Sequence, residues 1–396
     1  MNLFAYSKPL KHNRRSLSVL LALVLAILLT PFAEAAGRNY IVYVGTYTES
    51  GSKGIYAYRF DASTGEVNSI GLVAETESPL FLAVHPSGRF LFATNEINEF
   101  NGEKSGSVSA FSIDRNTGKL TLLNRVASQG AAPAHLSLDK TGKYLLVANY
   151  GGGSVAAFPI QSDGRLGKAS SFVQHAGSSV NPERQAAPHP HEIVVTDDNR
   201  FVLVPDLGLD EVLIYRFDAA KGSLTPNDPP FAKTDPGAGP RHLALHPNGR
   251  FVYVLNEMKS TVSTFSSDPH AGSLHPIGSL TTLPQDFSGQ NSTAEILTDA
   301  KGRFLYLSNR GHDSVAVFAI DSRAGTLSPI QDIPTGGKTP RNFAIDPTGT
   351  WLFAGNQESN NITLFRVDSH TGRLTRTKTV IQTGAPACVI FVPDVR

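Results

Sequence analysis

Four ionisable side chains occupy two positions that vary between similar segments of the same chain, one of which often carries a small or apolar residue. They are His191, Arg241, Glu257 and Arg310. An imidazole or a carboxylate can accept or donate a proton, and the planar fork of an arginine can bind a carboxylate or phosphate through two hydrogen bonds. If the fold brings the four together, they could hold an anion and move a proton beside it.

The elements that must position these residues are copies of one repeated unit. The copies are SPLFLAVHPSGRFLFATN, APAHLSLDKTGKYLLVAN, HPHEIVVTDDNRFVLVPD, GPRHLALHPNGRFVYVLN, STAEILTDAKGRFLYLSN and TPRNFAIDPTGTWLFAGN. The aligned turn residues are Gly88, Gly142, Asn199, Gly249, Gly302 and Gly349, with separations of 54, 57, 50, 53 and 47 residues. This period is typical of propeller blades.

Each unit is predicted to contain four antiparallel strands. A run rich in Val, Leu, Ile, Phe and Tyr precedes a Pro/Asp/Asn-Gly turn and a second apolar run follows it, which is the pattern of a hairpin. After Asn256, two further strands are expected at 261–266 and 274–280, joined by a turn at His270-Ala271-Gly272. Four such strands form a propeller blade.

The two ends of the chain complete a seventh unit. The segment PACVIFVPD resembles the first strand of a unit, and NYIVYVGTYT, GIYAYRF and VNSIGLVAE supply the other three. Pairing of 387–392 with 40–46 would close the ring and remove exposed sheet edges. We therefore predict an all-β, seven-bladed β-propeller of four-stranded antiparallel blades over residues 37–396. Even spacing argues against the alternatives, an open solenoid or a two-sheet sandwich.

Residues 1–36 are predicted to be a signal peptide. A basic segment ending at Arg14-Arg15 precedes the apolar run SLSVLLALVLAILLTPF, and the small residues Ala33 and Ala35 suit cleavage after Ala35. The protein is then periplasmic or secreted, with no membrane span after cleavage. An uncleaved anchor is the alternative, but the apolar run is shorter than the roughly 20 residues that cross a bilayer. Sec and twin-arginine export both remain open.

Composition excludes several classes of function. The chain has 35 Lys plus Arg against 34 Asp plus Glu, and without residues 1–35 the counts are 31 and 33, a net charge of −2. This balance gives no general affinity for nucleic acid. The single Cys388 excludes an internal disulfide framework and a Cys-based zinc cluster, and we expect it to be a small buried residue. No phosphate-loop, zincin, GxSxG or EF-hand motif is present.

Hairpin geometry places the candidate residues at one rim. If the turn lies at 247–249, Arg241 begins the descending strand and Asn256-Glu257 end the returning one. The same counting brings His191 near Asp206, Ala294 near Asn309-Arg310, and Arg341 near Asn356-Gln357. These positions share the axial mouth of the ring, which predicts substrate contacts at Arg341, Asn256, Asn309 and Asp206.

Each candidate also has a structural interpretation. Arg241 and Glu257 could form a rim ion pair worth under about 1 kcal/mol. The column Asn95, Asn149, Asp206, Asn256, Asn309 and Asn356 could cap strand ends. His135 and His242 fall one column away from the mouth, where we expect packing or hydrogen bonding instead of catalysis. His189 and His191 point to opposite faces of an extended chain, which disfavours a shared metal ion.

Several segments resemble a known family. They are VGTYTESGSKGIYAYRF, GAGPRHLALHPNGRFVYVLNE, LPQDFSGQNSTAEI and YLSNRGHDSVAVF, which are similar to those of the seven-bladed lactonase propellers. That family includes bacterial 6-phosphogluconolactonase and fungal carboxymuconate cyclase. The likeness covers residues 40–394 and includes the PRH-to-NE spacing and the insert around Asp286-Phe287-Ser288, which generic propellers lack.

The resemblance implies a metal-independent lactonase that needs no cofactor. The cyclase's proposed site of one histidine, two arginines and one glutamate falls on His191, Arg241, Glu257 and Arg310. By this likeness His191 or Glu257 is the general base or acid, and the two arginines hold the anionic group and polarise the carbonyl. We expect a monomer acting on a small lactone or anionic sugar derivative.

The export signal leaves other functions open. Export would separate the protein from the cytoplasmic phosphorylated sugar on which the family's phosphogluconolactonases act, so the lactone is not defined by the likeness. The alternatives are a non-catalytic exported propeller that binds a protein or polysaccharide, and a muconate-type cycloisomerase.

Overall fold

Repeated apolar strands, joined by polar turns, form the body of the protein. The computed structural model describes residues 1–3 and 39–395, so the predicted signal peptide and its cleavage site at Ala35 lie almost wholly outside the described residues. Residues 38–396 form one compact unit, and the fold given below is that of this unit.

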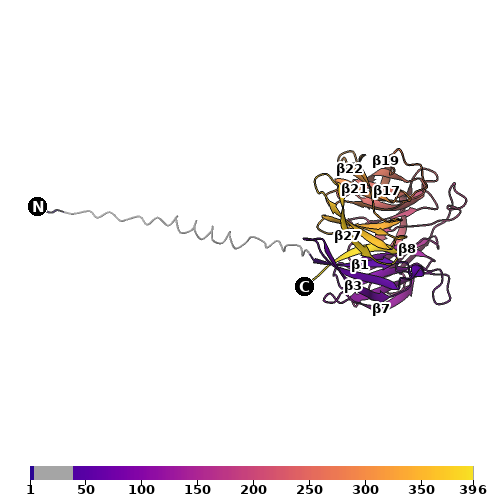
Figure 1. The fold of residues 1–396 in the computed structure, drawn as a ribbon, viewed down its shortest axis with the longest axis horizontal. Helices are drawn as coiled ribbons and strands as arrows, with labels where there is room; N and C mark the ends of the chain where they lie inside the picture. The colour runs from indigo at the N-terminus through magenta and orange to yellow at the C-terminus, as the bar shows by residue number, and fades with distance from the viewer. Residues whose placement is uncertain (4–38, 396) are drawn as a thin grey trace. The chain divides into compact units, whose positions relative to one another are not determined.

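Seven sheets of four antiparallel strands make up the unit (Figure 1). In hydrogen-bonding order, the first four sheets are β28 (Pro386–Pro393), β1 (Asn39–Thr46), β2 (Gly54–Asp61), β3 (Glu66–Glu75); β4 (Leu82–Val84), β5 (Phe90–Asn95), β6 (Ser107–Ile113), β7 (Leu120–Ala127); β8 (Pro133–Leu138), β9 (Tyr144–Asn149), β10 (Ser154–Pro159), β11 (Ser171–Gln174); and β12 (Val194–Val195), β13 (Phe201–Asp206), β14 (Glu211–Asp218), β15 (Ser223–Lys233).

The other three sheets are β16 (Pro240–Leu245), β17 (Phe251–Asn256), β18 (Thr261–Asp268), β19 (Ser273–Thr281); β20 (Ser292–Thr298), β21 (Phe304–Arg310), β22 (Ser314–Ile320), β23 (Leu327–Pro334); and β24 (Pro340–Ile345), β25 (Trp351–Asn356), β26 (Asn361–Val367), β27 (Leu374–Gln382). One 3-10 turn, η1 (Thr48–Ser50), follows β1. The prediction of seven four-stranded blades is therefore confirmed.

The ends of the chain close the ring through one sheet. Strand β1 pairs with β2 on one side and with the C-terminal β28 on the other, with Tyr43 opposite Ile390 and Gly45 opposite Cys388. Figure 1 shows the yellow C-terminal end beside indigo β1. The closure predicted from the sequence is thus confirmed, and the pairing covers an edge that would otherwise be exposed.

The hydrophobic core is divided into clusters that lie between neighbouring blades. In one of them Phe60 of β2 meets Phe353 of β25 edge to face, with ring centroids 4.9 Å apart. Cys388 is buried in another such cluster, as expected for a small apolar residue. Because each cluster joins two sheets, every blade depends on both neighbours for burial of its apolar faces.

Turn glycines lock each blade against the one before it. In six blades, the turn between the third and fourth strands places a glycine of positive φ under an aromatic ring of the preceding blade. The pairs are Gly65 under Trp351, Gly164 under Phe90, Gly222 under Tyr144, Gly272 under Phe201, Gly325 under Phe251 and Gly372 under Phe304. A Cβ atom at Gly272 would lie 2.4 Å from the Phe201 ring. Glycine is required here both by the backbone conformation and by the ring above it.

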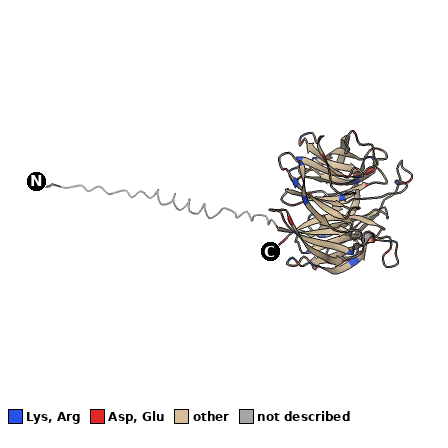
Figure 2. Cartoon of the chain, viewed as in Figure 1, with Lys and Arg blue, Asp and Glu red and all other residues tan. Residues whose placement is uncertain are grey.

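Charged residues are distributed without a dominant sign over the propeller. Figure 2 shows blue and red segments interspersed among tan strands, and neither colour covers the propeller in that view. Within residues 1–3 and 39–395, no helix has the length and apolar content needed to cross a bilayer.

The contact between blades can be tested with two glycine substitutions of matched conformation. Gly249 has φ of 70° and no atom within 4 Å of an added Cβ, whereas Gly272 has φ of 69° and lies under Phe201. Gly249→Ala should therefore lower the free energy of unfolding by about 1 kcal/mol through backbone strain alone. Gly272→Ala should cost about 1–3 kcal/mol more, because the ring must move. Urea unfolding measures both, and equal losses would contradict the packing role of Gly272.

Candidate active site

The mouth is formed where first and second strands of neighbouring blades meet. Pro240 pairs with Asn256, which brings Arg241 beside Glu257, and Ser292 pairs with Arg310. His191 lies just before β12, and its backbone N–H donates to the Pro205 carbonyl at 3.0 Å. The hairpin counting from sequence is therefore confirmed for the placement of these residues.

A bulge in several first strands turns two consecutive side chains toward the axis. Register shifts occur between Pro240 and His242, between Pro133 and His135, and between Pro340 and Asn342. A bulge leaves one residue unpaired and bends the strand, which re-aims its side chains. One cavity is consequently lined by two successive layers of the ring: Leu80, Phe81, Ala134, His191, Arg241, His242, Glu295, Arg341, Asn342 and Ala387.

Glu257 is the centre of the mouth. Its Oε2 atom lies 3.1 Å from Nε of Arg241 and 2.9 Å from Nη2 of Arg310, and its Oε1 atom accepts a hydrogen bond from Nη2 of Arg184 at 2.8 Å. Arg241 and Glu257 are 3% and 9% exposed. The pair is therefore buried and is not the solvated rim ion pair that the sequence left as an alternative.

The three guanidiniums keep Glu257 ionised. Burial alone would raise the pKa of its carboxyl, but Arg310, Arg241 and Arg184 outweigh burial and lower the pKa to about 2. Arg241 differs, because its charged form is disfavoured by its surroundings. Burial together with Arg310 and Arg341 lowers the pKa of its guanidinium to about 9. The mouth thus combines a carboxylate that binds protons weakly with arginines that are forced close together.

His191 is a buried imidazole without a fixed partner at one nitrogen. Its Nδ1 atom is buried and forms no hydrogen bond with a residue of 39–395, and its ring lies 5.4 Å from that of Tyr150 and 5.1 Å from that of His242. Burial, Arg241 and His242 lower the pKa of His191 well below 6.5. The imidazole is therefore neutral at pH 7 and can accept a proton.

Arg341 is a guanidinium that the protein leaves without a counter-ion contact. Its side chain is half-buried and lies over the Tyr47 ring, with Cζ 5.1 Å from the ring centroid. Within residues 39–395 it has no hydrogen-bond or ion-pair partner, although Glu96 is near enough to interact electrostatically. An arginine in this state can bind an anion from outside the protein.

The other predicted substrate contacts are occupied by the protein itself. Asn256 donates to the hydroxyls of Thr261 and Ser263, and Asn309 donates to the Thr282 carbonyl. Asp206 accepts hydrogen bonds from the N–H groups of His189 and Gly208 and pairs with His175 at 2.7 Å. All three are buried and tie strand ends together, while Oδ1 of Asn256 forms no hydrogen bond with a described residue.

Several residues at the mouth were not among the predicted site residues, although Glu96 and Tyr150 align with Glu257 and Arg310 in the repeat. Arg184 belongs to the long connection between β11 and β12, and Tyr47, Glu96 and Tyr150 follow the ends of second strands. The spacing of 57 residues in this part of the repeat was the only signal of an additional segment, and it did not indicate that Arg184 reaches Glu257. Loop conformation of this kind depends on tertiary contacts.

Neither histidine of the His189-Pro190-His191 segment has a partner suited to a metal ion. His189 stacks on Tyr150 with centroids 4.6 Å apart, while His191 meets the same ring edge on. Among the residues that the structure describes, no group of three or more His, Cys, Asp and Glu side chains could hold a metal ion.

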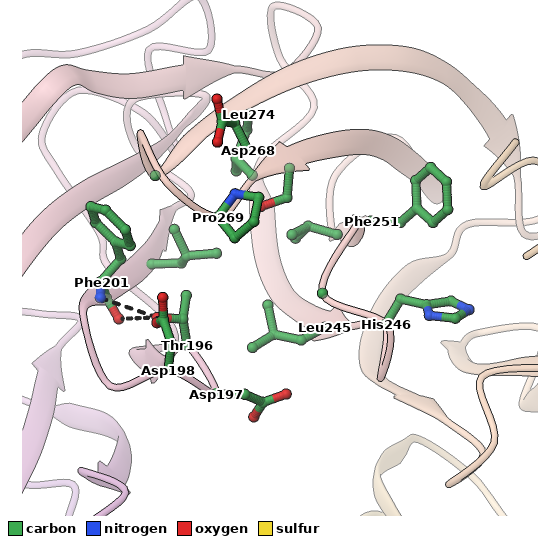
Figure 3. A pocket seen from close by; sticks show the side chains of 15 residues that line it. Thr196, Asp197, Asp198, Phe201, Leu245, His246, Phe251, Asp268, Pro269 and Leu274 are labelled. Carbon is green, nitrogen blue, oxygen red and sulfur yellow. Dashed lines mark hydrogen bonds between the residues drawn. The ribbon is translucent and has the colours of Figure 1, made fainter. Parts of the chain in front are cut away.

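A second hollow lies away from these residues. Figure 3 shows it between the turn at Thr196–Asp198, Leu245 and His246, and Pro269, with Phe201 and Phe251 at its sides. The hollow is lined by the turns that precede β13 and β17. Asp206 and Asn256 lie at the other ends of these two strands. None of the predicted site residues lines it.

The fold and the mouth define a seven-bladed propeller with an ionisable axial site. The family model described as Lactonase, 7-bladed beta-propeller, matches residues 41–391. The chain belongs to this lactonase family.

Named relatives cover nearly the whole propeller. The chain is 37% identical over 358 residues to a 6-phosphogluconolactonase of Bacillus subtilis (strain 168), covering 90% of this chain and 99% of that protein. A 6-phosphogluconolactonase of Formosa agariphila is 33% identical over 308 residues, covering 77% and 86%. The solved structure of a periplasmic gluconolactonase of Pseudomonas aeruginosa is similar with a TM-score of 0.84 and 35% identity, covering 90% of this chain and 99% of that one.

The charge of Glu257 should make stability depend on acid pH. Its pKa of about 2 in the folded protein lies below its ordinary value of 4.5, so its stabilisation is present above about pH 4.5 and is lost as the pH falls through 2. Glu257→Gln should lower the free energy of unfolding at pH 7 by on the order of 3 kcal/mol. Urea unfolding at pH 7, 4 and 2.5 should show the difference from wild type shrinking.

The exposed Glu99 offers a matched control for that experiment. Glu99→Gln should change stability by less than about 0.5 kcal/mol at each pH. A deficit of Glu257→Gln that is equally large at pH 7 and at pH 2.5 would contradict the proposed charge network.

Proposed function

We propose that the protein is a metal-independent lactone hydrolase, similar to 6-phosphogluconolactonase, which opens a sugar or related lactone to its hydroxy acid at the axial mouth. The observation that carries the proposal is the placement of a neutral, buried imidazole nitrogen in one cavity with Arg241 and Arg341. Membership of the lactonase family and the names of its relatives support the same reaction.

His191 is the general base in this proposal, and Glu257 is not. A base must be unprotonated near neutral pH and must have a free lone pair. His191 meets both conditions when its neutral ring carries the proton on Nε2, because burial keeps it neutral and the unpaired Nδ1 atom then holds the lone pair. Glu257 has a pKa of about 2 and is surrounded by three guanidiniums, so it is a poor proton acceptor and serves to hold Arg241 and Arg310 in place.

The arginines divide the work of binding and of stabilising charge. Arg241 and Arg310 are positioned beside each other by Glu257, where they can polarise the lactone carbonyl and stabilise the oxyanion that forms. Arg341, which has no counter-ion contact, holds the anionic group of the substrate. The buried Asn256, Asn309 and Asp206 have no role in substrate contact in this mechanism.

The charges of the mouth favour an anionic lactone. Four arginines, Arg184, Arg241, Arg310 and Arg341, lie near the carboxylates of Glu96 and Glu257, and a third carboxylate, that of Glu295, lies near Arg241 in the same cavity. A carboxylate or phosphate on the substrate would balance the excess of positive charge. The proposed substrate is therefore a lactone that carries either a carboxylate or a phosphate.

The removal of Arg341 should separate binding from chemistry. Arg341→Met should raise KM for an anionic lactone about 10- to 100-fold, since it removes a charge-assisted contact, and should change KM for an uncharged lactone less than about threefold. Lys338→Met, which removes an exposed cation on the preceding segment, is the control for long-range attraction. Steady-state hydrolysis of a panel of sugar and aromatic lactones measures both. Equal losses on charged and uncharged lactones would reject the anion-binding role.

The pH dependence of kcat/KM should report the buried imidazole. Because the pKa of His191 is well below 6.5, activity should persist below pH 6.5 and fall only as His191 becomes protonated. Arg341→Met should move this acid limb to higher pH, since Arg341 is one of the cations that disfavour the imidazolium. His191→Ala should remove the part of the limb that reports His191 and lower kcat/KM at least 100-fold. An acid limb at or above pH 6.5 in the wild type would exclude His191 as the base.

We also propose that the protein is exported to the periplasm or secreted after cleavage behind Ala35, and that it acts as a monomer. The basic and apolar N-terminal segment supports export, as does the similarity to a gluconolactonase named as periplasmic. Fractionation with N-terminal sequencing tests this proposal, and cytosolic protein with intact Met1 would reject it. Light scattering after gel filtration measures the oligomeric state.

A further inference from the structure

Below the mouth, a ring of buried imidazole, carboxylate and amide side chains closes the axial channel. Its polar members are His135, Glu192, His242, Glu295 and Asn342, and all are buried. The strand bulges, which include a register shift between Thr293 and Ile296, bring His242, Glu295 and Asn342 into the same cavity as the residues of the mouth. Burying this many polar groups is unfavourable unless their hydrogen bonds are made, so the pattern of those bonds indicates what each group does.

A chain of hydrogen bonds fixes the orientation of Glu295. The backbone N–H of Val389 donates to Asn342 Oδ1 at 2.9 Å, which turns the amide nitrogen of Asn342 toward Glu295 Oε2 at 2.5 Å. The backbone N–H of Ile296 donates to Glu295 Oε1 at 3.0 Å. The same Oε1 atom lies 3.0 Å from His242 Nδ1. Both carboxylate oxygens of Glu295 therefore act as acceptors.

This arrangement selects one tautomer of His242. Since Glu295 accepts from two other donors, its contact with His242 is satisfied by a proton on Nδ1. The Nε2 atom of the neutral ring then carries the lone pair. It is buried and forms no hydrogen bond with any described residue. A carboxylate that fixes the tautomer of a histidine and leaves its far nitrogen unprotonated is the arrangement found in hydrolytic triads.

His135 lies in the same ring but lacks this feature. Its Nδ1 atom accepts the backbone N–H of Ile193 at 3.4 Å, and its Nε2 atom faces Glu192 Oε1 at 3.7 Å. Both of its ring nitrogens therefore have a polar neighbour. The hydrogen bonding expected of both histidines from the sequence is present, yet only His242 has a free nitrogen and lines the cavity.

The cavity has the size and the polar groups to hold one water molecule. The space open to the centre of a water molecule is about 10 Å³, which is at the lower limit for admitting one water. Three of its lining residues have buried atoms without hydrogen bonds: His191 Nδ1, His242 Nε2 and Arg241 Nε. Arg241 Nε is 3.1 Å from Glu257 Oε2 but is not aligned for a hydrogen bond. Two acceptors and one donor are the partners that a bound water requires.

We propose that His242 is a further catalytic residue, whose Nε2 atom binds and orients the water that attacks the lactone, and that Glu295 and Asn342 are its positioning residues. The inference rests on the proposed function. One hydrogen of the water points to His191 Nδ1 and the other to His242 Nε2, so a lone pair of the oxygen faces the carbonyl above. Arg241 contributes its Nε–H to the same oxygen before reaction.

The chemical step is balanced by these groups. As the water oxygen bonds to the carbonyl carbon, His191 Nδ1 takes the first proton and the carbonyl electrons form the oxyanion. The oxyanion then re-forms the carbonyl, the bond from this carbon to the ring oxygen breaks, and the proton on His191 passes to the ring oxygen. The second hydrogen, held by His242 until then, remains on the new carboxyl group and is released to solvent as the acid ionises.

Three substitutions test the role of His242. His242→Gln and Glu295→Gln should each lower kcat at least 10-fold and leave KM within about threefold of wild type, because the arginines that bind the substrate are unchanged. Glu295→Gln preserves size and tests the tautomer directly. His135→Gln alters the same ring without touching the cavity, and it should keep kcat within about twofold. Thermal unfolding establishes that each variant is folded.

The pH profile supplies a readout that a structural role would not move. Loss of the Glu295 charge should shift the acid limb of kcat to lower pH, because the carboxylate favours protonation of His242. The charged and titratable groups that face His242 are Arg241, Arg310, Arg341, Glu257, Glu295, His135 and His191. Of these only Glu295 is changed in the Glu295→Gln variant, so the shift is assigned to it.

The outcomes separate this inference from the proposed function. If wild type is active and both His242→Gln and Glu295→Gln match His135→Gln in kcat and in pH profile, the role of His242 is rejected while the lactonase function stands. If His242→Gln does not fold, the isosteric Glu295→Gln decides. If wild type opens no lactone of the panel, the proposed function fails and the inference fails with it. A crystal structure with a water within hydrogen-bond distance of His242 Nε2 and His191 Nδ1 would support it.

Discussion

A single buried carboxylate, that of Glu257, holds the mouth of this propeller together. Arg241 and Arg310 converge on one of its oxygens and Arg184 on the other. Guanidiniums brought this close would repel one another strongly where water is excluded, and removal of one partner of a buried ion pair is costly for that reason. The carboxylate compensates part of this repulsion and leaves a positive excess, which suits the site to an anion. Burial, Arg241 and Arg341 disfavour the imidazolium form of His191, lower its pKa well below 6.5 and so maintain a proton acceptor at neutral pH.

The ring makes this arrangement possible because it brings residues far apart in the chain to one axis. His191, Arg241 and Arg341 begin first strands of three different blades, and each lines the same cavity. The ring is closed by β28 beside β1, and each apolar cluster lies between two blades. The geometry at the centre therefore depends on packing throughout the circumference. A glycine turn under an aromatic ring, repeated at most blade boundaries, sets the spacing between neighbouring sheets.

The mouth and the ring beneath it differ in how their charges are satisfied. In the mouth, charged groups such as Arg341 keep unused hydrogen-bonding capacity, which is the property of a site that binds ligands. In the ring beneath it, most polar groups are joined to backbone N–H groups of the next blades, as Glu192 is to Leu243 and Asn342 is to Val389. His242 belongs to both layers. One of its nitrogens is fixed by Glu295 and the other faces the cavity.

The sequence by itself determined the repeat, the seven blades and the closure of the ring. It also determined the meeting of His191, Arg241, Glu257 and Arg310. It could do so because the strand period and the turn positions are local properties that recur in each copy. It could not indicate that Asn256, Asn309 and Asp206 are buried and hydrogen-bonded to neighbouring segments, since a position at a strand end does not specify what covers it. Only the tertiary structure decided that Arg184 reaches Glu257 and that a strand bulge turns His242 toward the axis. It also decided the chain of hydrogen bonds from Val389 through Asn342 and Glu295, which sets the tautomer of His242. These features arise from contacts between blades, and no periodicity within a single blade encodes them.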